Sequence, residues 1–164
     1  MSDVPSAENG NAEEAAAGMQ PPLMIGAQYI KDLSFENPNA PMALVNLSEG
    51  PAIDVSIDVD VNKLQERLFE VVLTLRVKAA SKETVVFMIE LDYAGLASIG
   101  QAVSEADSER LLLTDVPRHL FPFARAVVSD MTRDGGFPPL LINPIDFNEL
   151  YANRKARDRQ AASA

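Results

Sequence analysis

A stretch of strict alternation near the middle of the chain constrains the fold more than any other feature. Apolar residues occupy every second position from Ile53 to Val61, and the intervening positions hold Asp54, Ser56, Asp58 and Asp60. Successive side chains of a β-strand point to opposite faces of the sheet, so this pattern predicts a half-buried strand with an acidic outer face.

Three further runs alternate in the same way, over residues 24–35, 69–78 and 85–93. In the first run we expect Tyr29, Leu33 and Phe35 on the inner face. The outer face of that run carries Gln28, Ile30, Asp32, Ser34 and Glu36, and the outer face of the last run carries Val86, Met88 and Glu90. Residues 81–83 form a link short enough for a hairpin between the last two runs. Consecutive strands with short links predict an antiparallel sheet with one covered face.

Helical patterns follow the strands. Residues 104–116 begin with acidic side chains that suit a helix N-terminus, and a stronger amphipathic pattern covers residues 118–133 before Gly135 and Gly136 stop it. Pro122 lies inside that pattern, which suggests a later start or a kink. We expect Asn143 to cap a last helix with Pro144 at its first position. The expected fold class is α+β, a four-stranded antiparallel sheet with two main helices packed on one face.

The two ends of the chain differ from the middle in composition. Residues 1–22 are acidic and poor in apolar side chains, so we expect a disordered tail. Residues 23–153 form the expected domain. Residues 154–164 are basic, and we expect a flexible C-terminal tail there.

Composition excludes several classes of protein. The net charge of −10 argues against nucleic acid as a partner, because phosphate binding requires clustered Lys or Arg. No apolar stretch approaches the roughly 20 residues that span a bilayer, so no membrane insertion is expected. Cysteine is absent and the N-terminus lacks the features of a secretory signal, which favours a cytoplasmic protein.

Residues that would carry catalysis are scarce. His119 is the single histidine, and no nucleophile or acid is evident as its partner. Asp54, Asp58 and Asp60 stand in a row along one strand face, whereas calcium ligands converge on one point. We therefore expect no enzymatic activity, no metal and no cofactor; a small α+β enzyme that depends on His119 is the rival interpretation.

Apolar residues remain after one core is filled. Val72, Val86 and Met88 add apolar surface to the face expected to be wet, and the apolar arc of the helix over 118–133 is wider than one contact needs. Surplus apolar surface commonly becomes a subunit interface, so we expect an oligomer.

Three collinear blocks give the chain a family resemblance. The segment YIKDLSFENPNAP from Tyr29 to Pro41 resembles the opening strand of the SecB family of bacterial export chaperones. The segment LFPFAR from Leu120 to Arg125 is similar to that family's helix motif. Residues 136–147 are similar to its connecting loop and last helix.

The resemblance implies a homotetramer, built as a dimer of dimers, that binds unfolded precursor polypeptides and delivers them to the export motor SecA. It also implies that Asp32, Glu36, Met88 and Glu90 meet the basic, zinc-bearing C-terminal tail of SecA. These four residues share the outer parity of their strands, and acidic side chains around an apolar one suit a basic partner with a hydrophobic anchor.

A groove for clients is harder to locate from sequence. It should be apolar and tolerant of many sequences, and the candidates are Phe35, Phe87, Leu91, Tyr93, Phe121, Phe137 and Leu140. Each of these residues, taken alone, is more often part of a core. The alternative to a general chaperone is an adaptor or chaperone of the same fold that is dedicated to one specific partner.

Overall fold

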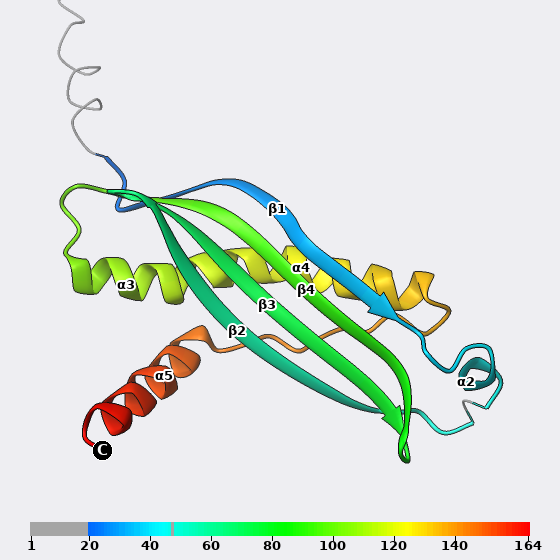
Figure 1. The fold of residues 1–164 in the computed structure, drawn as a ribbon. Helices are drawn as coiled ribbons and strands as arrows, with labels where there is room; N and C mark the ends of the chain where they lie inside the picture. The colour runs from blue at the N-terminus through cyan, green and yellow to red at the C-terminus, as the bar shows by residue number, and fades with distance from the viewer. Residues whose placement is uncertain (1–19, 47) are drawn as a thin grey trace, which may run out of the picture.

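A four-stranded antiparallel sheet forms the centre of the molecule (Figure 1). The computed structural model describes residues 20–46 and 48–164. The strands are β1 (Leu23–Glu36), β2 (Ala52–Gln65), β3 (Leu68–Ser81) and β4 (Thr84–Ile99), and they lie in the order β1-β4-β3-β2. The helices are α2 (Met42–Val45), α3 (Glu105–Leu113), α4 (Asp115–Asp134) and α5 (Phe147–Ala162).

The helices and the sheet confirm the expected α+β class. Figure 1 shows α3 and α4 running nearly in line along one side of the sheet, and α4 contacts β1, β3 and β4. Between them lies the core, in which Leu73, Leu75, Leu91, Leu120 and Val128 have no exposed surface. We call the opposite side of the sheet the open face.

Two tight turns connect the long strands. The expected hairpin between β3 and β4 is present, and Lys82 adopts a positive φ of 57° in its turn. Residues 66–67 join β2 to β3 in the same manner. The strand β4 continues to Ile99. The alternation in the sequence ends earlier, near Tyr93, because Ala94, Gly95 and Ala97 weaken the apolar pattern beyond that point.

Two irregularities in β1 change which side chains face the core. The register between β1 and β4 shifts between Ile25 and Gln28 and again between Ile30 and Asp32. Each shift adds one residue to β1. The first added residue reverses which side chains face the core, and the second restores the original alternation. Tyr29 therefore lies on the open face and Ile30 on the helix side, the reverse of the expectation from simple alternation.

The helix α4 is longer than its sequence pattern indicates. It begins at Asp115 and continues through Pro122 to Asp134. Its end has a left-handed residue, Gly136 with φ of 94°, and the N–H of Phe137 donates to the carbonyl of Thr132. This is the glycine-terminated helix end that the paired glycines predict.

The C-terminal helix α5 covers most of residues 154–164, where the sequence led us to expect a flexible tail. The carboxylate of Asp146 accepts hydrogen bonds from the N–H groups of Asn148 and Glu149, and the helix then continues to Ala162. The guanidinium of Arg154 donates to the carbonyl of Val59 at 2.7 Å, so α5 is attached to the edge of β2. Basic side chains hold this helix in place through such contacts, although its sequence has little apolar periodicity.

Two further expectations concern the surface and the N-terminus. Val72 and Val86 are buried within one protomer, so they do not supply the surplus apolar surface expected of them; Met88 is half-buried. Residues 1–19 of the expected acidic tail lie outside the described residues. None of the helices in the described part of the chain has the length and apolar character to cross a bilayer.

Candidate functional site

Polar side chains from all four strands cover the half of the open face nearer the β3–β4 hairpin, which we call its lower half. Odd-numbered residues of β4 face the core, so the even-numbered ones and their partners on neighbouring strands face outward. The register aligns them in three rows across β2, β3, β4 and β1: Asp54, Lys78, Met88 and Glu36; then Ser56, Arg76, Glu90 and Ser34; then Asp58, Thr74, Asp92 and Asp32.

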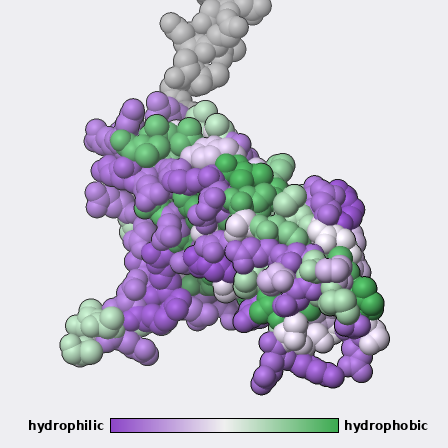
Figure 2. Space-filling model, turned by 45° about the vertical axis from the view of Figure 1, so that its right-hand side comes forward, coloured by the Kyte–Doolittle hydropathy of each residue, from purple (hydrophilic) through white to green (hydrophobic). Residues whose placement is uncertain are grey.

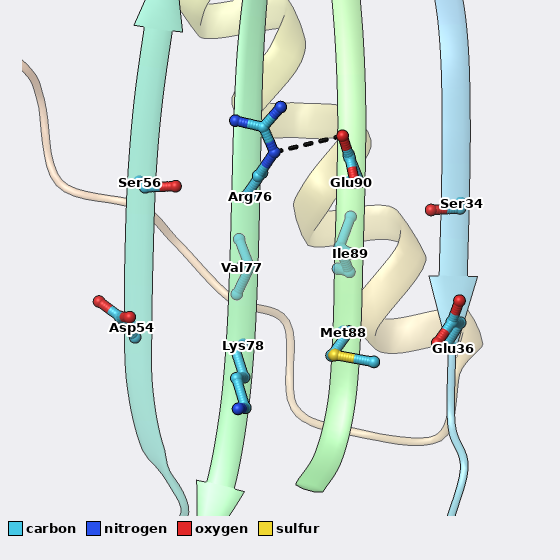
Figure 3. A pocket seen from close by; sticks show the side chains of 10 residues that line it. All are labelled: Ser34, Glu36, Asp54, Ser56, Arg76, Val77, Lys78, Met88, Ile89 and Glu90. Atoms are coloured by element: carbon cyan, nitrogen blue, oxygen red, sulfur yellow. Dashed lines mark hydrogen bonds and ion pairs between the residues drawn. The ribbon is translucent and has the colours of Figure 1, made fainter.

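A shallow hollow of about 220 Å³ lies over the first two rows. Figure 3 looks onto it and shows Met88 between Lys78 and Glu36, with Glu90 in the neighbouring row. All four residues expected to dock SecA are thus on the open face, and Glu36, Met88 and Glu90 line one hollow. Asp32 lies in the third row, beyond Ser34.

The carboxylates of these rows differ in what they contact. Asp32 accepts the N–H of Leu33 at 3.1 Å, and Glu90 accepts the Nε–H of Arg76 at 3.2 Å. The Glu36 side chain makes no hydrogen bond or ion pair with any described residue. The rows contain six carboxylates and two cationic side chains, so the lower half of the open face is acidic.

A second polar cluster stands higher on the open face, around Glu70. Its carboxylate accepts hydrogen bonds from Lys31 at 2.8 Å, Tyr29 at 2.6 Å and Asn62 at 3.0 Å. These donors, led by the Lys31 ammonium, lower the pKa of Glu70 to about 2. The hydrogen bond to Glu70 in turn raises the pKa of the Tyr29 hydroxyl to about 12. Sequence reasoning did not single out Glu70, and its only signal is a charged residue among the apolar ones of β3.

The aspartates of β2 stand in a line along the strand. Asp54, Asp58 and Asp60 all lie on the open face, as the alternation predicts, and Ser56 separates the first two. Among residues 20–46 and 48–164, no three acidic or histidine side chains gather closely enough to hold an ion. His119 is exposed on α4.

The aromatic members of the candidate groove set lie in three separate groups. Phe87 packs between Phe35 and Phe137, with ring centroids 6.0 and 4.9 Å apart. Tyr93 stacks on Phe123 at 6.4 Å, and Phe121 meets Phe147 edge to face at 6.1 Å.

Burial limits which of these residues a client can reach. Leu91 has no exposed surface, and Phe87, Tyr93, Phe121 and Phe137 are also buried in the core. Phe35 and Leu140 are half-buried and are the two members of the candidate set that retain accessible surface.

A more exposed apolar group lies beside them, on α2. Met42, Leu44 and Val45 are exposed, and a hollow of about 550 Å³ separates α2 from the β3–β4 hairpin. Leu44 also lies against Gly136 at the end of α4, close to the Phe35 group. Figure 2 shows that apolar residues on this side of the molecule form separate patches interrupted by hydrophilic residues.

Comparison with known proteins agrees with this architecture. The family described as preprotein translocase subunit SecB matches residues 16–158. Protein-export protein SecB of Maricaulis maris is 49% identical over 99% of this chain and 91% of its own length. The protein of the same name from Parvibaculum lavamentivorans is 48% identical over 96% of this chain and 92% of its own length.

A solved structure has the same fold at lower identity. A SecB-like chaperone of Mycobacterium tuberculosis, in complex with a peptide from an antitoxin, superposes with a TM-score of 0.64 at 17% identity, over 81% of this chain and 95% of that one. At this identity the likeness concerns the fold alone. The matches over nearly the whole chain, at almost half identity, decide the assignment: the chain belongs to the SecB family of protein-export chaperones.

Proposed function

We propose that this protein holds unfolded precursor polypeptides in the cytoplasm and delivers them to SecA, acting as a homotetramer built from two dimers. The observation that carries the proposal is the acidic open face, on which Glu36, Met88 and Glu90 surround one hollow. A half-buried thioether among carboxylates suits a basic partner that also brings an apolar anchor.

Docking on this face requires no catalytic group. A basic segment that binds here gains Coulomb attraction to several carboxylates at once, and the attraction weakens with salt because the side chains are solvated. Glu36 and Asp54 both line the hollow and make no ion pair within the described chain, so both carboxylates can form a new one; Glu36 lies beside Met88. Met88 supplies the apolar contact beside it.

Client binding uses a different part of the surface in this proposal. Phe35 and Leu140, together with the exposed Met42, Leu44 and Val45 of α2, offer apolar side chains around the end of the sheet. A tetramer would present four copies of this surface to one extended chain. Several weak contacts on one client raise the overall affinity through effective concentration, so no single site needs to be tight.

Refolding of a slow-folding precursor tests the client function. We expect stoichiometric tetramer to delay refolding, because binding of the unfolded form shifts the folding equilibrium by mass action. Refolding at an unchanged rate would contradict the proposal. A chaperone dedicated to one partner would delay that partner alone and leave several unrelated unfolded proteins unaffected.

The docking function has its own test. Binding of purified SecA is measured for the wild type and for Glu36→Gln, which preserves the shape of the side chain and removes its charge. We expect about a two- to fivefold loss of affinity at low salt, the usual range for one exposed charge pair. Asp158→Asn, a matched change on α5 outside this hollow, serves as the control.

A further inference from the structure

The docking carboxylates of the open face are not equally available to a partner. Glu36 makes no ion pair within the described chain, whereas Glu90 is paired with Arg76 at 3.2 Å. Glu90 on β4 and Arg76 on β3 lie directly opposite each other, and Figure 3 shows their side chains pointing toward one another at the rim of the hollow. A basic partner that reaches Glu90 must therefore meet a cation already in place.

The contact between Arg76 and Glu90 is of the kind that exchanges readily. The side chains are 55% and 52% exposed, and only the Nε–H of the guanidinium donates to the carboxylate. An Arg–carboxylate pair held through both guanidinium branches would be stronger and more specific. A single, solvated contact competes with an incoming cation but does not block it.

We infer that Arg76 is a specificity-determining residue of the docking face, because it acts as an internal competitor for Glu90 that a basic partner has to displace. The inference rests on the proposed docking function. A cation that brings one isolated charge gains little by replacing Arg76. A partner that engages Glu36 and Met88 at the same time gains the additional contacts and displaces Arg76 without a net loss. The face thereby favours partners that match the whole hollow over polycations in general.

Lys78 provides the matched comparison for this role. It lies on the same strand two residues from Arg76, it lines the same hollow, and it makes no ion pair within the described residues. Arg76→Gln and Lys78→Gln both remove one positive charge from the hollow. Only Arg76→Gln also releases Glu90, so the difference between the two variants measures competition rather than net charge.

The experiment titrates the full-length protein with a labelled, amidated peptide of lysines and arginines around a central leucine, and follows fluorescence anisotropy at low salt. We expect Arg76→Gln to tighten binding about two- to fivefold more than Lys78→Gln does. In a Glu90→Gln background we expect the two substitutions to have equal effects, because no carboxylate is left to release.

The outcomes separate the inference from the proposed function. If Glu90→Gln weakens binding while Arg76→Gln tightens it no more than Lys78→Gln, or weakens it, the competitor role is overturned and the docking function stands. If Arg76→Gln still tightens binding more than Lys78→Gln does in the Glu90→Gln background, Arg76 acts by another route and the inference is again wrong. A wild-type protein that binds neither the peptide nor SecA would overturn the docking function and the inference together.

Discussion

Glu70 connects three strands of the sheet through one carboxylate. Its donors come from β1 (Tyr29 and Lys31) and β2 (Asn62), although β4 lies between β1 and β3. The small side chain of Ala94 on β4, the register partner of Tyr29, leaves room for the tyrosine to reach across. The cluster fastens the irregular part of β1 to the rest of the sheet, and so holds the parity that brings Asp32 onto the open face.

The first prediction concerns the pH dependence of stability. The folded-state pKa of Glu70 is about 2, below its ordinary value of 4.5, so the stabilisation is complete above about pH 5 and is lost as pH falls toward 2. We expect Glu70→Gln to lower the free energy of unfolding by about 2 kcal/mol at neutral pH and by much less near pH 2.5. Urea unfolding across this range measures the difference.

The control is Glu66→Gln, an exposed carboxylate in the turn between β2 and β3. Its effect on the free energy of unfolding should be small at every pH, as for most surface substitutions. A difference between wild type and Glu70→Gln that stayed constant with pH would contradict the ionic role assigned to the cluster.

Gly135 is a second residue whose identity follows from its surroundings. A Cβ atom at this position would overlap the ring of Phe35, so the aromatic ring packs against the bare backbone at the end of α4. We expect Gly135→Ala to displace the ring and to lower the free energy of unfolding by about 1–3 kcal/mol. Chemical denaturation measures the change. Gly50→Ala, whose added methyl has no atom of residues 20–46 and 48–164 within 4 Å, should have a much smaller effect.

At the scale of elements, predictability from sequence follows from how each element is stabilised. Residues 55–61 of β2, 75–79 of β3 and 87–93 of β4 are more buried on one face than on the other, so their alternation is visible in the sequence. Two irregularities in β1 reverse the faces of Tyr29 and Ile30, and no local pattern marks them because Glu70, far away in sequence, holds the tyrosine. The face on which Asp32 and Glu36 lie was predictable because both residues come after the second irregularity, where the original parity returns.

The helix α5 illustrates the opposite case. A sequence with Arg154, Lys155, Arg157 and Arg159 has no apolar stripe to predict a packed helix. Phe147, Leu150 and Tyr151 in its first turns pack against the core, and specific polar contacts hold the rest of the helix. Examples are Arg154 to the carbonyl of Val59 and Lys155 to Glu109. Pairings of this kind depend on which elements the fold brings together, and composition alone cannot identify them.

Arg154 also protects an edge of the sheet. The carboxylate of Asp58 accepts the N–H of Val59 at 2.9 Å while Arg154 donates to the carbonyl, so both backbone groups of this residue in the edge strand β2 are satisfied. Edge strands with free backbone groups promote aggregation. We expect Arg154→Gln to lower the free energy of unfolding by about 1–2 kcal/mol and to increase light scattering on heating.

The exposed Arg159→Gln is the matched control for Arg154, since it removes the same charge from the same helix. Its thermal unfolding and light scattering should stay close to those of the wild type. Equal behaviour of the two variants would mean that the charge of α5 matters and the contact with β2 does not.

At the scale of the whole molecule, the proposed tetramer needs apolar surface that one protomer leaves uncovered. Val72 and Val86 do not supply it, because both are buried. Phe123 of α4 is 52% exposed while it stacks on Tyr93, and Ile30, the register partner of Tyr93, is 47% exposed on β1. Phe123 and Ile30 are thus two exposed apolar residues that both adjoin Tyr93, and Ile30 lies on the edge strand β1. An exposed aromatic residue such as Phe123 is typical of an interface anchor.

We therefore expect Phe123→Asp to shift the proposed tetramer toward smaller species in native mass spectrometry, where one chain weighs 17.8 kDa. Leu64→Asp is the control, because Leu64 is also 52% exposed but lies on β2, at the other edge of the sheet. A wild type that is monomeric at micromolar concentration, or a Phe123→Asp variant that remains tetrameric, would contradict this assignment. If the assignment holds, Phe123→Asp should also weaken binding of long unfolded chains far more than binding of short apolar peptides, since each protomer keeps its own apolar surface and loses only the effective concentration of its neighbours.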